Sequence, residues 1–240
     1  MTQQMNEALR SGLDTLAESV AEVKPKLRGW MHLATAPLTL AGGIVLVILS
    51  PDATTRWGSA LFSASALVLF TVSAVYHTGS WSPRVWTFLR RFDHANIFVL
   101  IAGSYTPLTL ILLEGTQRTM LLTTVWTCAL LGVLFRVFWT DAPRWLHTPI
   151  YIAMGWVAIV FLPDFAQGAY ERLGGDIGTA VMVLIAAGGA LYTLGGIVYG
   201  FQRPNPWPRW FGFHEVFHTF TILAFVTHYV GISMATYALR

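Results

Sequence analysis

Seven long apolar stretches, separated by short polar loops, dominate the pattern of this 240-residue chain. Several of them approach or exceed the roughly 18 apolar residues that indicate a membrane-spanning helix. The fifth is short and is bounded by Pro149 and Pro163. To within a few residues, the stretches cover 32–50, 58–79, 94–113, 119–139, 148–164, 177–200 and 213–238. The pattern predicts an all-α protein that folds as a seven-transmembrane helix bundle.

The first 28 residues are polar, but their apolar positions recur at helical spacing. Six of them lie three or four residues apart: Met5, Leu9, Leu13, Leu16, Val20 and Val23. This spacing predicts an amphipathic helix that Pro25 ends. Such a helix lies either on the membrane surface or against the bundle or a partner. We therefore divide the chain into an N-terminal amphipathic segment, 1–28, and a membrane domain, 29–240.

The composition agrees with a membrane protein and excludes other classes. The chain is 55% hydrophobic and only 11% charged, whereas about a quarter of a soluble domain is charged. Its basic residues are scattered between apolar stretches, so we expect no nucleic-acid partner. Cys128 is the only cysteine, which excludes an internal disulfide and a cysteine-rich metal site.

Lysine and arginine predict the orientation of the bundle. Eleven of the 15 fall in the N-terminal segment and in the second, fourth and sixth loops, and four fall on the opposite side. Because basic residues are enriched in cytoplasmic loops, we expect a cytoplasmic N-terminus and an external C-terminus.

Three histidines are then predicted to lie at one depth, near the cytoplasmic boundary. His214 and His218 begin the seventh stretch, one helical turn apart on the same face. His77 ends the second stretch, which runs inward. Three imidazole ligands with an open fourth position are typical of catalytic zinc, so we expect a Zn²⁺ site. Each histidine alone is better explained as a boundary residue bonded to backbone, but ionisable groups gathered inside a membrane are usually functional.

Two further residues lie at the same depth. Asp93 could accept a proton from zinc-bound water or orient it, or it could form a salt bridge with Arg90 or Arg91. Ser73 shares a helix face with His77 and could orient water or a substrate carbonyl. In apolar helices, however, serine commonly bonds the carbonyl four residues earlier, and spacing alone favours that alternative.

The remaining histidines are not assigned to the site. His94 is turned about 100° from its neighbour Asp93 on a helix. His32 and His147 are interpreted as boundary residues. His228 lies ten residues beyond His218, or about 15 Å along a helix, which is too far for the same ion.

His214 to His218 also fits H-E-x-x-H, the zinc metalloprotease signature, in which Glu215 would be the general base. No acidic residue follows Glu215, so the usual downstream ligand is missing. An intramembrane protease could take its third ligand from Asp93 or His77. This interpretation is kept as a third hypothesis.

Three separated motifs together resemble a known family. They are Ser73-x-x-x-His77, Phe92-Asp93-His94 running into Ala102-Gly103-Ser104-Tyr105-Thr106-Pro107, and His214-x-x-x-His218. The pattern resembles the hemolysin III group of the progestin and adiponectin receptor superfamily, which is related to alkaline ceramidase-like membrane hydrolases. The resemblance covers about residues 28–238 and looks closest to the bacterial branch.

The resemblance implies a seven-helix bundle with a cytoplasmic N-terminus, in the inner membrane of a bacterial cell. It also implies zinc held by His77, His214 and His218, water held by Asp93, and Ser73 close by. The leading hypothesis is a zinc-dependent hydrolase of lipid amides or esters, with membrane lipids or fatty acid as partners. The alternative is a non-catalytic protein that senses lipid or maintains the membrane around a structural zinc ion. Retinal-type light sensing is excluded because Lys24 and Lys26, the only lysines, precede the first span.

Overall fold

A computed structural model describes residues 27–240, and within them the chain folds as a bundle of long helices. The elements are α2 (Trp30–Ile48), α3 (Ala53–Thr78), α4 (Pro83–Leu112), α5 (Gly115–Phe138), α6 (Arg144–Gly155), the 3₁₀ helix η1 (Trp156–Phe161), α7 (Leu162–Leu173), α8 (Gly175–Phe201) and α9 (Phe213–Tyr237). Seven helical segments are long and apolar enough to cross a membrane. The predicted all-α, seven-span, multi-pass membrane fold is confirmed.

The fifth span is longer than the sequence predicted. It runs from Arg144 to Leu173 and combines α6, η1 and α7. Pro149 lies inside α6, and Pro163 lies in the first turn of α7, where proline's missing N–H costs no hydrogen bond. The predicted start at 148 agrees with Arg144 to within a few residues, whereas the predicted end at 164 was wrong because it treated Pro163, a tolerated proline, as a boundary.

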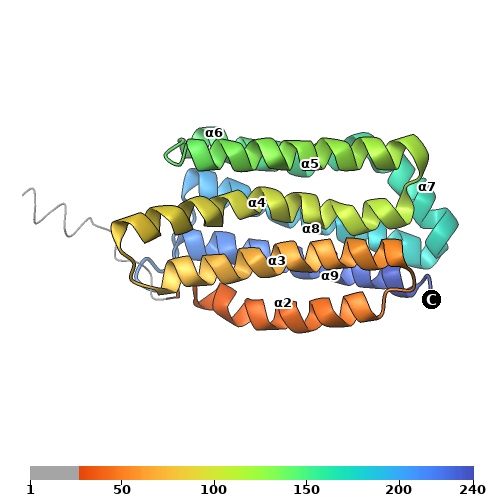
Figure 1. The fold of residues 1–240 in the computed structure, drawn as a ribbon, viewed down its shortest axis with the longest axis horizontal. Helices are drawn as coiled ribbons and strands as arrows, with labels where there is room; N and C mark the ends of the chain where they lie inside the picture. The colour runs from red at the N-terminus through yellow and green to blue at the C-terminus, as the bar shows by residue number, and fades with distance from the viewer. Residues whose placement is uncertain (1–26) are drawn as a thin grey trace, which may run out of the picture.

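The helices run up and down side by side, with α2 to α5 in front of α8 and α9 in the view of Figure 1. We call the end where α3 and α5 finish and α4 and α9 begin the proximal end. The most extensive packing joins α8 to α9, α3 to α4, α2 to α3 and α4 to α5. In α4, 72% of the most apolar window is buried, against 28% in α2 and α5. The central helix is therefore α4, and whatever its first half carries lies inside the bundle.

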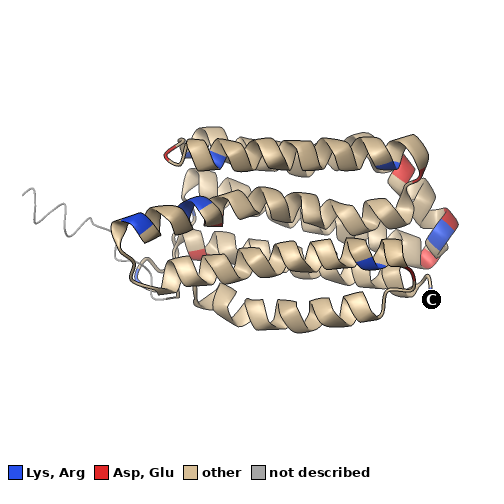
Figure 2. Cartoon of the chain, viewed as in Figure 1, with Lys and Arg blue, Asp and Glu red and all other residues tan. Residues whose placement is uncertain are grey.

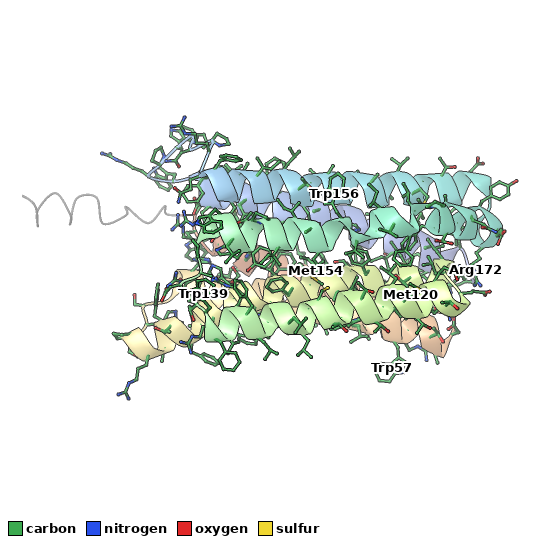
Figure 3. All side chains as sticks on the ribbon, turned by 90° about the horizontal axis from the view of Figure 1, so that it is seen from above. Trp57, Met120, Trp139, Met154, Trp156 and Arg172 are labelled. Atoms are coloured by element: carbon green, nitrogen blue, oxygen red, sulfur yellow. The ribbon has the colours of Figure 1, made fainter. Side chains whose placement is uncertain are left out.

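Apolar and charged residues divide along the bundle as a membrane requires. Phe62, Phe70, Phe98 and Phe225 form part of the buried core, while other large apolar side chains, such as Trp57, point outward (Figure 3). The charged residues gather at the two ends of the bundle (Figure 2). The predicted amphipathic helix of residues 1–28 lies outside the described residues, apart from Leu27 and Arg28.

Candidate metal centre

The proximal end brings three histidines together from two helices. His77 lies in the last turn of α3, and His214 and His218 lie in the first turns of α9. The His77 ring centroid is 4.9 Å from that of His214 and 5.3 Å from that of His218. One ligand atom from each ring lies within 4.8 Å of the other two. The antiparallel packing of the bundle thus joins residues about 140 positions apart.

The histidine cluster suits a metal ion. The two α9 residues each keep a buried ring nitrogen, Nε2 of His214 and Nδ1 of His218, that has no hydrogen-bond partner within residues 27–240. Two nitrogens on one tetrahedral zinc ion lie about 3.4 Å apart. The ligand atoms therefore need to approach by at most about 1.4 Å, which rotation of the rings can provide. The described residues thus offer three protein ligands for one ion.

Asp93 and Ser73 line the same small pocket, of about 30 Å³, which suffices for one or two water molecules. Asp93 Oδ2 lies 3.7 Å from His77 Nε2, but Asp93 is not part of the three-histidine group. It makes no salt bridge with the neighbouring arginines, because Arg90 bonds Asp141 and Arg91 bonds the hydroxyl of Thr140. The carboxyl group therefore faces the metal centre.

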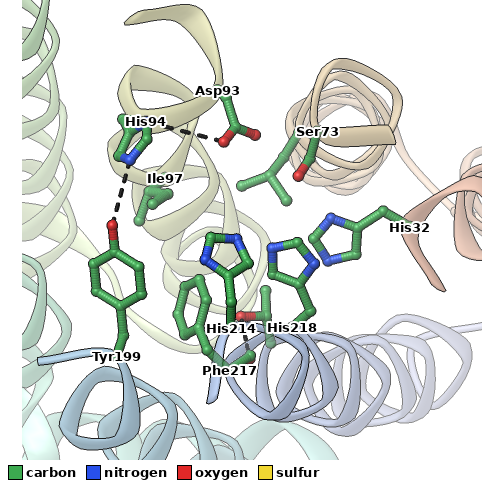
Figure 4. A pocket seen from close by; sticks show the side chains of 11 residues that line it. His32, Ser73, Asp93, His94, Ile97, Tyr199, His214, Phe217 and His218 are labelled. Carbon is green, nitrogen blue, oxygen red and sulfur yellow. Dashed lines mark hydrogen bonds and ion pairs between the residues drawn. The ribbon is translucent and has the colours of Figure 1, made fainter. Parts of the chain in front are cut away.

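Ser73 does not follow the structural alternative, in which a serine bonds the backbone carbonyl four residues earlier. Ser104 and Thr78 donate hydrogen bonds to the carbonyl four residues earlier, whereas within the described chain Ser73 makes no such bond. Its hydroxyl lies across from the Asp93 carboxyl group (Figure 4). The hydroxyl thus interacts with Asp93 on the wall of the pocket.

Glu215, the candidate metalloprotease base, is engaged elsewhere. Its Oε1 accepts a hydrogen bond from Arg28 Nε at 2.8 Å, and its Oε2 accepts one from the Gly212 N–H at 2.8 Å. The side chain is 1% exposed and does not line the pocket. Because Glu215 caps α9 and pairs with Arg28, these contacts argue against a general base at this position.

Two histidines that the sequence analysis set aside line the pocket. His32, interpreted from the sequence as a boundary residue, is 2% exposed, and its ring stacks on His218 with centroids 3.9 Å apart. His94 lies behind Asp93, with Nδ1 3.9 Å from Oδ2, and its Nε2 lies 3.4 Å from the hydroxyl of Tyr199 (Figure 4). The sequence placed both residues at the starts of apolar stretches, on the same side as the three histidines, and that was the signal that could have included them in the site.

The other two histidines lie outside the pocket. His147 was predicted at the boundary, but it is only 2% exposed, and its ring centroid lies 6.3 Å from that of His94. His228 packs on Tyr192, outside the three-histidine group, in agreement with its predicted distance.

Comparison with known proteins identifies the same family that the sequence motifs resemble. The family described as Haemolysin-III related matches residues 20–229. The chain is 30% identical over 188 residues to the Hemolysin-3 homolog of Bacillus subtilis, covering 77% of this chain and 81% of that protein. It is 34% identical over 143 residues to Hemolysin-3 of Bacillus cereus, covering 60% and 61%. It is 23% identical over 200 residues to human Monocyte to macrophage differentiation factor, covering 80% and 76%.

Proposed function

This chain belongs to the haemolysin-III related family, and from that premise we propose that it is a zinc-dependent membrane hydrolase of lipid amide or ester bonds. The observation that carries the proposal is the group of three histidines with a carboxylate and a hydroxyl on one pocket wall. His77, His214 and His218 would hold the ion. Zinc, when bound, supplies a Lewis acid that activates water near neutral pH and polarises a carbonyl.

The chain's own residues would carry the proton and orient the substrate. Asp93 would accept a proton from the attacking water and return it to the leaving nitrogen or oxygen as the bond to the carbonyl carbon breaks. Ser73 would donate a hydrogen bond to the carbonyl oxygen. His94 bonds the Arg90 carbonyl oxygen through Nδ1 and pairs with the Tyr199 hydroxyl through Nε2, so it would form a fixed part of the pocket wall beside Asp93.

The pocket lining favours a lipid substrate. Leu69, Ile97 and Phe217 form an apolar part of the wall, beside the polar groups. An acyl chain could lie against the apolar side while its amide or ester group faces Asp93 and Ser73. A pocket of about 30 Å³ admits water but not such a chain, so substrate entry would require these three side chains to move apart.

We also propose that the protein lies in the cell (inner) membrane of a bacterium, with its metal site on the cytoplasmic side. Eight of the twelve arginines in residues 27–240 belong to the proximal end of the bundle or its loops. The positive-inside tendency then favours a cytoplasmic proximal end. The relatives from Bacillus support a bacterial location.

The test combines metal analysis with an assay of hydrolysis. Purified protein should contain about one zinc ion per chain and should hydrolyse one or more members of a panel of lipid amides and esters. His77→Ala should lose both properties, because it removes one of three ligands. Hydrolysis that persists without zinc would refute the mechanism. Full zinc occupancy without turnover on any lipid would favour the non-catalytic alternative.

A further inference from the structure

A second buried polar cluster lies next to the three-histidine group and shares His94 and Tyr199 with the pocket described above. Its centre is Arg136, in the last turn of α5, whose side chain is only 1% exposed. Arg136 is close enough to interact electrostatically with His94, His147, Tyr151 and Tyr199. These four residues come from α4, α6 and α8.

Arg136 is a buried cation without a protein counter-ion in residues 27–240. No carboxylate of the described chain lies within 4.0 Å of it: Asp141 pairs with Arg90, and Asp93 lies beside His77 and His94. Its Nε and Nη1 atoms are buried and have no hydrogen-bond partner there. The negative end of the α5 dipole offsets only a part of the cost of burying such a charge.

A second group in the cluster has the same feature. His147 is 2% exposed, and its Nδ1 atom also has no partner within the described chain. A neutral histidine can donate from this nitrogen, as can the hydroxyl groups of tyrosines. The His147 ring centroid lies 5.6 Å from that of Tyr151 and 6.0 Å from that of Tyr199. The hydroxyls of both tyrosines already bond His94, so the cluster combines the positive charge of Arg136 with the unpartnered ring nitrogen of His147.

We propose that Arg136 and His147 form a binding site for a small inorganic anion, such as chloride. The positive charge of Arg136 favours an anion as the ligand. The burial of Arg136 and His147 favours a small one. Because Arg136 is 1% exposed, a lipid headgroup or a long carboxylate would have to displace the surrounding rings, and a monoatomic ion would require the smallest displacement. This inference does not depend on the hydrolase activity.

The test measures anion-dependent stability in the full-length purified protein. Chloride is exchanged for gluconate at constant ionic strength, and the melting temperature is recorded as chloride is titrated back. At about ten times the dissociation constant, chloride should raise the melting temperature by about 3–6 °C. Arg136→Met should abolish this rise. Arg91→Met is the matched control, because Arg91 is an exposed arginine at the same end whose Nε bonds the Thr140 hydroxyl, and it should keep the rise.

A direct measurement covers the case in which the Arg136 variant fails to fold. Crystals of the wild-type protein grown in bromide should show an anomalous peak beside the Arg136 guanidinium. Equal melting temperatures in chloride and gluconate would overturn the proposal. A chloride effect of the same size in Arg136→Met, or bromide bound only elsewhere, would overturn it as well.

Discussion

Replacing Glu215 with glutamine should destabilise the fold and weaken metal binding without acting directly on the reaction. Glu215 lies between the two α9 ligands, His214 and His218, and is 1% exposed. Both of its oxygens accept hydrogen bonds from donors, the Arg28 guanidinium and the Gly212 N–H. Glutamine has one acceptor oxygen and one donor nitrogen, so one of these two donors must face another donor.

The size of the effect follows from those two bonds. A hydrogen bond to a charged group contributes about 1.5–3 kcal/mol, and an unsatisfied buried donor costs a similar amount. Loss of the cap on α9 adds about 1 kcal/mol. We expect Glu215→Gln to lose about 2–4 kcal/mol, or roughly 5–15 °C in melting temperature. Zinc affinity should fall about 10- to 100-fold, as for other residues that orient metal ligands.

A double-mutant cycle with Arg28→Met isolates the ion pair. Arg28→Met alone should also be destabilising, because it leaves the Glu215 carboxylate buried without its partner. The double variant should be more stable than the sum of the two losses predicts, with a coupling of at least about 1 kcal/mol. Thermal melting and elemental analysis of zinc are measured on all four proteins.

One pattern of results would refute this reasoning. If Glu215→Gln retained zinc and wild-type stability but lost all hydrolysis, Glu215 would be a general base, and the metalloprotease interpretation would be revived. Strict additivity of the two substitutions would show that the bond between Arg28 and Glu215 is not coupled in solution.

Three further substitutions test other parts of the structure. Asp93→Asn should keep zinc but lower turnover about 10²- to 10⁴-fold, because an amide cannot accept the proton; steady-state kinetics and metal analysis check this. Gly29→Ala should cost about 1–3 kcal/mol in a melting experiment, since Gly29 has φ +86° and a Cβ would lie 2.8 Å from that of His77. A hydrogen bond from the Thr55 hydroxyl holds the pKa of Asp52 below its usual value. The stability that Asp52 contributes as the α3 cap is therefore present at neutral pH and lost as pH falls through its folded pKa, so Asp52→Ala should be destabilising only above that pKa.

The fold could be predicted from the sequence because the membrane leaves few alternatives. Each span must satisfy its backbone hydrogen bonds internally, so a long apolar stretch can only be a helix or part of a closed barrel. The far end of the fifth span could not be predicted in the same way. Pro163 is compatible with a helix start, and only the packing of the neighbouring turns distinguishes this position from a boundary.

The predicted depth of each histidine in the membrane was the property that pointed to the histidine cluster. Depth alone could not assign His32 and His94 to the same pocket. Depth brings His77 level with His214 and His218, and the structure gathers all three. Depth does not give the rotation of each helix about its axis. The rotation of α2 turns His32 onto His218, and the rotation of α4 lets Asp93 and His94 line one pocket although they are adjacent in the chain. Those rotations are determined by packing between helices, which a single sequence does not display.

Glu215 shows why a short motif cannot decide a mechanism. The five residues from His214 to His218 are compatible with a metalloprotease base or with a structural cap, because both need a carboxylate at the start of a metal-binding helix. What separates the two is a partner 187 positions away, Arg28, together with the backbone N–H of Gly212. A carboxylate with both oxygens bonded to fixed donors is poorly suited to accept a proton. Asp93, next to His77 and free of the arginines on its own helix, has the contacts that a proton acceptor requires.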